Sequence, residues 1–120
     1  MEEILPQNFT GAEDDLQSKC FQWAWNTYPE HRRLLFHVNN KSKNAIEGNQ
    51  MKAKGVVSGI SDMVLIRQEG KVAWLEFKTV KGKQRDCQID FENKVKKYGH
   101  DYYLIRTFEQ FYTLYKKLML

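Results

Sequence analysis

The sequence has little of what marks membrane, secreted or repetitive proteins. None of its apolar runs approaches the roughly 20 residues of a transmembrane helix, and residues 1–10 lack the basic stretch followed by an apolar core of a signal peptide. We therefore expect a cytoplasmic protein without a membrane partner. The 120 residues also contain no repeats, linkers or low-complexity tracts, which predicts one domain around a single core.

Cysteine is scarce as well, with only Cys20 and Cys87 in the whole chain. The two lie far apart, and each stands among residues with helical spacing. Neither has the paired spacing or the nearby histidine that would indicate a zinc site. We therefore expect two free thiols, buried or half-buried, and no disulfide framework.

The net charge is only +4, yet the two signs are unevenly distributed along the chain. Acidic residues gather in the first 15 positions, whereas lysine and arginine gather after position 40. A basic surface of this kind suits a polyanion such as DNA, although ordinary solvated lysines would give the same composition. The residues that we expect to contact DNA are Lys41, Lys43, Lys52, Lys54, Lys81, Lys83 and Arg85.

Hydrophobic periodicity divides the chain into alternating helices and strands. Residues 1–11, which contain Pro6 and no periodicity, predict an extended arm, and residues 12–120 predict a single folded domain. Within the domain we expect helices at 12–28, 42–54, 84–98 and 108–120, and strands at 34–38, 62–67, 72–78 and 101–107. A hairpin followed by a strand-helix-strand crossover predicts an α/β (α+β) fold, with a central mixed four-stranded sheet flanked by helices.

One hairpin is unusual because charged residues stand at one end of two apolar strands. An unpaired charge on a half-buried strand is costly, so Asp62, Glu76 and Lys78 require an explanation. Side chains alternate between the two faces along a strand, so Glu76 and Lys78 share a face. Asp62 joins them if the hairpin loop has an odd number of residues, with Gly70 in the left-handed conformation, or if a bulge or splayed end intervenes. A two-residue loop would place Asp62 on the opposite face.

An acid at the start of one strand, followed across a hairpin by Glu-x-Lys, resembles the active-site pattern of the PD-(D/E)XK nuclease superfamily. Further motifs resemble, in order and spacing, its VRR-NUC family. These motifs are Glu13 with Gln17, the His-x-Asn-Asn run of residues 37–40, the run of residues 55–62, Gly82, Gln88 with Phe91, and Gly99 before an aromatic strand. Two positions depart from the family pattern. Val56-Val57-Ser58 replaces its Val-Arg-Arg-like run, which weakens the case for a phosphate contact there, and Ser61 replaces the usual proline.

The resemblance implies a PD-(D/E)XK restriction-endonuclease-like fold and Mg²⁺- or Mn²⁺-dependent hydrolysis of DNA. The residues that it assigns to catalysis are Glu13, Asp62, Glu76, Lys78 and Gln88, and the metal ligands that it implies are Asp62, Glu76, the Phe77 backbone carbonyl and Glu13. Mg²⁺ prefers oxygen ligands, and a lysine beside it would orient a water or neutralise developing charge. Small stand-alone members of the family, often bacterial or phage-encoded, resemble Holliday junction resolvases, which implies a branched DNA substrate and a homodimer.

Other interpretations of these residues stay open. Glu13 is alternatively a first-turn partner of the helix dipole, with Asp14 and Asp15 as rivals for its role. Gln88 is alternatively a solvent-facing helix residue, and His37 a hydrogen-bonded structural residue rather than a catalytic one. The alternative function is a non-catalytic DNA-binding or assembly module that retains the fold. A restriction enzyme that reads sequence is disfavoured, because the chain leaves little room for a recognition element.

Overall fold

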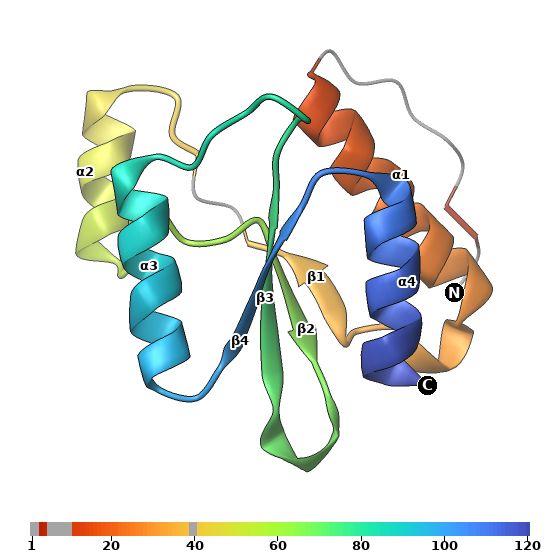
Figure 1. Cartoon of the computed structure of the whole chain (residues 1–120). Helices are drawn as coiled ribbons and strands as arrows, with labels where there is room; N and C mark the ends of the chain where they lie inside the picture. The colour runs from red at the N-terminus through yellow and green to blue at the C-terminus, as the bar shows by residue number, and fades with distance from the viewer. Residues whose placement is uncertain (1–2, 5–10, 39–40) are drawn as a thin grey trace.

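The structure is a computed structural model that describes residues 3–4, 11–38 and 41–120. Within these residues the centre is a four-stranded sheet in the order β1-β2-β3-β4 (Figure 1). The strands are β1 (Leu35–His37), β2 (Met63–Ile66), β3 (Val72–Phe77) and β4 (Asp101–Ile105). Pairing is antiparallel from β1 to β2 and from β2 to β3, whereas β3 and β4 are parallel. The predicted mixed sheet is therefore confirmed.

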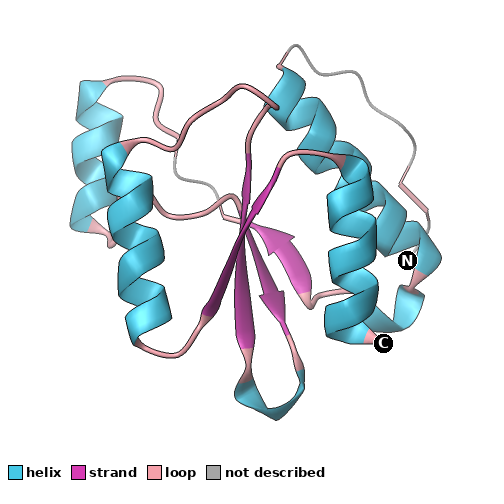
Figure 2. Cartoon of the chain, viewed as in Figure 1, coloured by secondary structure: helices cyan, strands magenta, loops and turns pink. Residues whose placement is uncertain are grey.

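In the same part of the chain, four α-helices flank the sheet. They are α1 (Ala12–Thr27), α2 (Ala45–Ala53), α3 (Asp86–Lys97) and α4 (Phe108–Met119). Figure 2 shows α1 and α4 together on one side of the sheet, and α2 and α3 on the other. The predicted crossover is α3, which connects the parallel strands β3 and β4. None of the described helices is long and apolar enough to cross a membrane.

The core lies between the sheet and the pair α1 and α4. Alternate residues of β2 and β3 point into it and are almost fully buried, as strand periodicity predicted. They are Met63, Leu65, Ala73, Leu75 and Phe77. The helices contribute Cys20, Ala24, Phe111 and Tyr115 to the same cluster. Cys20 and Cys87 are both free thiols, as expected, and burial raises the pKa of Cys20 to about 12, so it packs as a small apolar residue.

Several boundaries differ from the predictions. The helix expected at 42–54 begins only at Ala45, because the Asn44 side chain caps it by accepting a 2.8 Å hydrogen bond from Glu47 N. The strand expected at 101–107 ends at Ile105, because Thr107 caps α4 in the same way. Two short 3-10 turns, η1 (Pro29–His31) and η2 (Gln68–Gly70), lie outside the predicted helices.

Two of the candidate site residues also lie just outside the strands assigned to them. Asp62 immediately precedes β2, and Lys78 immediately follows β3. Most of the predicted arm 1–11 falls outside the described residues, as do Asn39 and Asn40 of the His-x-Asn-Asn run. Within the described part, Ile4 exchanges two hydrogen bonds with the Asn26 side chain near the end of α1.

Candidate active site

The β2–β3 hairpin brings two acids together at one end of the sheet. Met63 pairs with Leu75 in the antiparallel ladder. One position further, Asp62, which precedes Met63, therefore lies opposite Glu76, which follows Leu75. The loop that sets this register is η2, which has three residues. Its last residue, Gly70, has φ +73°, which is the left-handed conformation that an odd loop was expected to require. The predicted register is confirmed.

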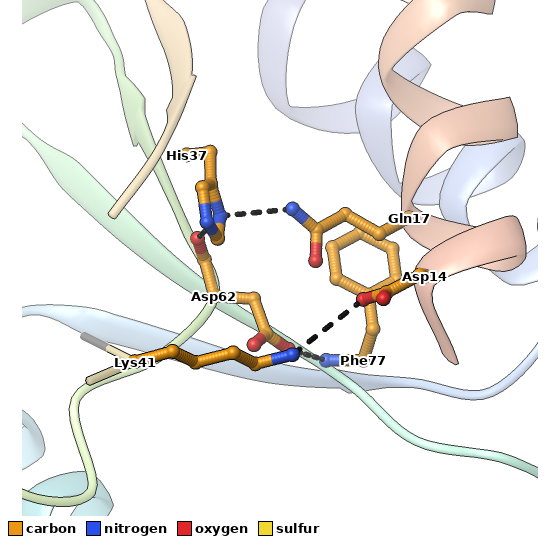
Figure 3. Close-up of polar contacts among 6 residues, drawn as sticks. All are labelled: Asp14, Gln17, His37, Lys41, Asp62 and Phe77. Atoms are coloured by element: carbon orange, nitrogen blue, oxygen red, sulfur yellow. Dashed lines mark hydrogen bonds and ion pairs between the residues drawn. The ribbon is translucent and has the colours of Figure 1, made fainter. Parts of the chain in front are cut away.

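Asp62 is held by the backbone of the neighbouring strand. Its Oδ2 accepts a 2.7 Å hydrogen bond from Phe77 N (Figure 3). Because Phe77 follows Glu76 in β3, this hydrogen bond fixes the carboxylate beside Glu76. Its carbonyl oxygen accepts a 2.9 Å hydrogen bond from Val38 N, just beyond β1. Both interactions come from main-chain atoms, which makes the position of Asp62 a property of the sheet.

Glu76 lies in surroundings that disfavour its charged form. Only 1% of its surface is exposed, and Oε2 accepts a 2.7 Å hydrogen bond from Gln88 Nε2. Oε1 is buried without a donor, the one such side-chain atom among the described residues. Burial, followed by the negative charge of Asp62 and by a hydrogen bond that the protonated Glu76 shares with the Asp62 carboxylate, raises the pKa of Glu76 to about 8. The nearby positive charge of Lys78 lowers that pKa, but it does not offset the burial.

The two acids open into a cleft of about 720 Å³. It runs between the first turns of α1 and α3, and it is lined by Gly11, Ala12, Glu13, Asp14, Gln17, Lys41, Ser42, Ile60, Asp62, Glu76, Lys78, Thr79, Arg85 and Gln88. All five residues predicted to act in catalysis therefore border one space. Lys78 is 7% exposed, and it forms no ion pair with any residue that the structure describes. A buried ammonium of this kind needs an anionic partner.

Gln88 reaches Glu76 because it also caps its own helix. Its Oε1 accepts a 2.8 Å hydrogen bond from Arg85 N at the start of α3, and its Nε2 then points toward Glu76. Gln88 is 5% exposed, so the solvent-facing interpretation is wrong. One amide thus joins the first turn of α3 to the acid pair.

Glu13 is the least constrained of the predicted residues. Its side chain is exposed in the first turn of α1, and its charge contributes to raising the pKa of Glu76. In the described part of the chain, however, no three His, Cys, Asp or Glu side chains are grouped closely enough to hold one ion. Glu13 therefore shares the cleft with Asp62 and Glu76 without forming a closed three-acid site.

A further set of contacts lies at and beside the cleft, among residues that were not assigned to catalysis or metal binding, although Lys41 was predicted to contact DNA. Lys41 Nζ lies 3.9 Å from Asp14 Oδ1. His37 Nδ1 lies 2.9 Å from Gln17 Nε2 and 2.9 Å from the Asp62 carbonyl oxygen. Figure 3 shows that these groups connect α1, β1 and the start of β2. The sequence signals for Gln17 and His37 were the spacing of Gln17 from Glu13 and the position of His37 at a strand end.

The seven residues predicted to contact DNA are all exposed, but they occupy different places. Only Lys41 and Arg85 line the cleft. Lys81 and Lys83 lie on the loop between β3 and α3, and Lys43, Lys52 and Lys54 lie around α2. The positions that replace the Val-Arg-Arg-like run line a separate hollow beside α2, together with Lys52. That run therefore borders α2 rather than the acids.

The acid pair has the properties of a site for a hard divalent cation. Asp62 and Glu76 offer carboxylate oxygens, which Mg²⁺ and Mn²⁺ prefer. A cation between them would give Glu76 Oε1 the partner that it lacks and would remove the repulsion that raises its pKa. On these grounds the residues present fit such an ion.

Comparison with known proteins identifies solved structures that share this fold. No family model matches the sequence, and no curated protein matches it. Among solved structures, a "VRR_NUC domain protein" has a TM-score of 0.71 and 15% identity, covering 92% of this chain and 90% of its own. A second structure, "VRR_NUC domain", has a TM-score of 0.57 and 17% identity over 82% of this chain and 92% of its own. The chain therefore has the fold of VRR_NUC domains, as the sequence motifs implied.

Proposed function

We propose that this protein is a VRR-NUC-type nuclease that hydrolyses DNA phosphodiester bonds with the help of Mg²⁺ or Mn²⁺. The observation that carries the proposal is the unpartnered, buried Oε1 of Glu76 beside Asp62, in a cleft that also contains the unpaired Lys78. A buried acid with an incomplete set of partners is destabilising unless a ligand completes it. The shared fold with VRR_NUC domains supports the same function.

Asp62 and Glu76 would hold the ion, with the Phe77 carbonyl as a further oxygen ligand and Glu13 acting from the edge of the cleft. When bound, such an ion supplies Lewis-acid polarisation of the phosphate and activation of a water molecule. The protein prepares this arrangement in advance, because Phe77 N fixes Asp62 and Gln88 fixes Glu76. These hydrogen bonds leave the buried Glu76 Oε1 without a donor.

Lys78 would act on the reacting phosphate. Its position directly after β3 places it in the cleft on the face of Glu76. Its ammonium would orient the attacking water or neutralise the negative charge that develops in the transition state. It forms no ion pair with any described residue, so its ammonium can contact an anion.

Basic residues around the cleft would hold the DNA backbone. Lys41 and Arg85 line the cleft itself, and Lys81 and Lys83 lie on the adjoining loop. Contacts to phosphates dominate affinity and make it salt-dependent. We expect the affinity for DNA to fall steeply with salt concentration, and a flat response would argue against a surface that follows phosphates.

We further propose branched DNA, such as a Holliday junction, as the substrate and a homodimer as the active form. Both follow from the sequence resemblance to stand-alone VRR-NUC proteins. A dimer also has a physical basis, because the described part of the chain offers one such cleft with Asp62 and Glu76, and cutting both strands needs two sites in symmetric register.

Cleavage assays test the nuclease proposal directly. The protein would be incubated with labelled four-way junctions, flaps and linear duplex, each with Mg²⁺, Mn²⁺ or EDTA. We expect metal-dependent cleavage that Glu76→Ala reduces by about 100-fold or more. Glu30→Ala is the matched control, since Glu30 is an exposed acid in η1, outside the cleft. Cleavage that persists in Glu76→Ala would exclude this assignment.

A non-catalytic DNA-binding or assembly module is the second candidate. The observation that favours it is the absence, among the described residues, of three acids grouped around one ion position. Calorimetric titration with Mn²⁺ separates the two functions. Heat of binding at millimolar Mn²⁺ in the wild type, lost in Asp62→Asn, favours the nuclease. No binding heat in the wild type favours the module.

A further inference from the structure

The cleft continues past Asp62 into a second groove that the nuclease mechanism does not use. This groove has a volume of about 460 Å³. Its lining residues are Asp14, Gln17, Ser18, Phe21, Phe36, His37, Lys41, Asp62 and Met63. Four of these also line the acid cleft, namely Asp14, Gln17, Lys41 and Asp62. The two spaces are therefore adjoining parts of one surface depression, which meet at Asp62.

The chemistry of the groove changes with distance from the acids. Phe21 and Phe36 give its far part an aromatic character. Phe36 is 40% exposed on β1, an edge strand of the described sheet, although an aromatic side chain gains free energy from burial. Phe21 packs against Trp25 with ring centroids 5.7 Å apart. An exposed aromatic ring next to a phosphate-binding cleft offers a stacking surface for a base.

Polar groups border the same groove on the side of the acids. His37 Nδ1 lies within hydrogen-bond distance of both the Gln17 amide nitrogen and the Asp62 carbonyl oxygen, and the ring tautomer decides which of the two it bonds. An amide side chain can both donate to and accept from the edge of a base. These contacts connect the border of the groove to the backbone of an acid that would act on the phosphate (Figure 3).

We propose that this groove binds one unpaired nucleobase of the strand that is cut, next to the scissile phosphate. The proposal rests on the proposed nuclease function and specifies its substrate. The phosphate would lie at Asp62 and Glu76, Lys41 would lie beside the connecting backbone, and the base would enter the groove along Phe36. The volume falls within the range of roughly 300–1,000 Å³ typical of ligand sites.

A base inside a duplex cannot enter such a groove without leaving its stack. Extruding it costs a few kcal/mol, and this cost is lowest where the base is already single-stranded or mispaired. The groove therefore favours DNA with an unpaired nucleotide beside the cleavage position over a continuous duplex. This selection requires no reading of the duplex sequence, so it suits a chain of 120 residues.

An abasic scan tests the groove without relying on cleavage. Flap substrates would carry one abasic site at successive positions around the branch, and binding would be measured by anisotropy in EDTA. We expect one position at which the missing base raises Kd by roughly 5- to 100-fold, the range of a lost base stack. Blunt duplex should bind more weakly than the intact flap.

Variants of the groove identify where the base is bound. In Phe36→Ala and Gln17→Ala, the abasic effect at that position should fall to less than about 2-fold. These variants no longer contact the base of the intact substrate, so its removal changes the affinity little. Phe36→Trp should retain the effect. Tyr98→Ala is the matched control, because Tyr98 is an aromatic residue of similar size that is 74% exposed and lies outside the groove.

Each outcome decides a different point. A flat abasic scan in a protein that binds DNA would overturn the proposal that the groove binds a base. An abasic effect that is unchanged in Phe36→Ala and Gln17→Ala would overturn it as well. A position-specific effect in a protein that cuts no DNA with Mg²⁺ or Mn²⁺ would overturn the nuclease function and would still support base binding in the groove. Absence of any DNA binding overturns both.

Discussion

Gln88 Nε2 donates a 2.7 Å hydrogen bond to Glu76 Oε2, while Oε1 of the same amide accepts a 2.8 Å hydrogen bond from Arg85 N. Because the amide oxygen serves the helix start, the amide nitrogen is directed toward the acid. Gln88 therefore determines which oxygen of Glu76 is satisfied and which one, Oε1, is left without a donor. The start of α3 and the acid pair form one structural unit.

Replacement of this amide by an acid should destabilise the fold in a pH-dependent way. Gln88→Glu keeps an acceptor for Arg85 N but places a second carboxylate against Glu76. We expect a loss of about 1–3 kcal/mol in the free energy of unfolding at pH 8, the cost of an unsatisfied buried group. At pH 5 the loss should be smaller, because a proton shared between the carboxyl groups replaces the lost donor. Urea denaturation at both pH values measures the difference.

The matched control for this substitution is Gln110→Glu. Gln110 has the same position in α4, where its Oε1 accepts a 2.7 Å hydrogen bond from Arg106 N, but it is exposed and faces no buried acid. We expect its replacement to change stability little at either pH. Equal pH dependence in the two variants would contradict the role assigned to the Gln88–Glu76 hydrogen bond.

The raised pKa of Glu76 predicts how stability and metal binding depend on pH. Glu76 has a folded-state pKa of about 8 against an ordinary value of 4.5. Between these values the folded protein retains a proton that the unfolded chain has lost, so stability should fall as pH rises from 5 to 8. The fall is on the order of a few kcal/mol. Denaturation from pH 5 to 8 without metal should show it, and Glu76→Gln should remove most of it.

A divalent ion should reverse this trend, because it replaces the proton on Glu76. We expect the increase in Tm caused by millimolar Mn²⁺ to be small at pH 5 and larger at pH 8. At pH 8 Glu76 is protonated in fewer molecules, so the ion competes less with a proton. Thermal unfolding with and without Mn²⁺ measures both values. An Mn²⁺ effect that is independent of pH, or one that persists in Glu76→Gln, would argue against binding at this acid.

The acid pair was predictable because it depends on local rules. Alternation along the strands predicted that Glu76 and Lys78 share a face, whereas the loop length was left open, and the three-residue η2 ending in Gly70 sets the register of Asp62 against Glu76. The orientation of Gln88 was not predictable, since it depends on the tertiary position of the start of α3. The boundaries of α2 were also predicted poorly, because that helix buries none of its residues and its sequence carries little periodic signal.

The close approach of the loop before Asp62 to α3 gives a further prediction. Gly59 has φ +79°, and a Cβ there would lie 2.1 Å from Cys87 O and 2.8 Å from Gln88 N. Gly59→Ala must therefore displace the first turn of α3, at a cost of about 3 kcal/mol from backbone strain and overpacking. Gly70→Ala is the control, because Gly70 has φ +73° but open space around it. It should cost about 1 kcal/mol.

Chemical denaturation of both variants, followed by calorimetry with Mn²⁺, tests this account. Gly59→Ala should weaken Mn²⁺ binding as well as stability, because Gln88 moves with α3, whereas Gly70→Ala should leave Mn²⁺ binding unchanged. Similar losses of stability in the two variants would show that the left-handed backbone alone, and not the contact with α3, requires glycine at position 59.

The basic loop after Lys78 depends on one arginine that the sequence analysis did not single out. Arg106 Nη1 donates to three carbonyl oxygens, at 2.7 Å from Thr79 O, 2.6 Å from Gly82 O and 3.3 Å from Val80 O. Because the partners are main-chain atoms of a loop, no residue pattern in the sequence predicts these hydrogen bonds. One guanidinium therefore maintains the turn that carries Lys81 and leads into α3.

Removal of this guanidinium should loosen the loop and leave the rest of the fold in place. In Arg106→Gln we expect tryptic cleavage after Lys81 and Lys83 to become about 10-fold faster, since proteolysis follows the population of opened loop. DNA affinity should fall several-fold as these lysines lose their fixed positions. Arg67→Gln is the control, because Arg67 likewise donates to a backbone carbonyl, Leu118 O, but lies beside the β2–β3 turn. Equal acceleration at Lys81 and Lys83 in both variants would indicate general destabilisation and would contradict a local role for Arg106.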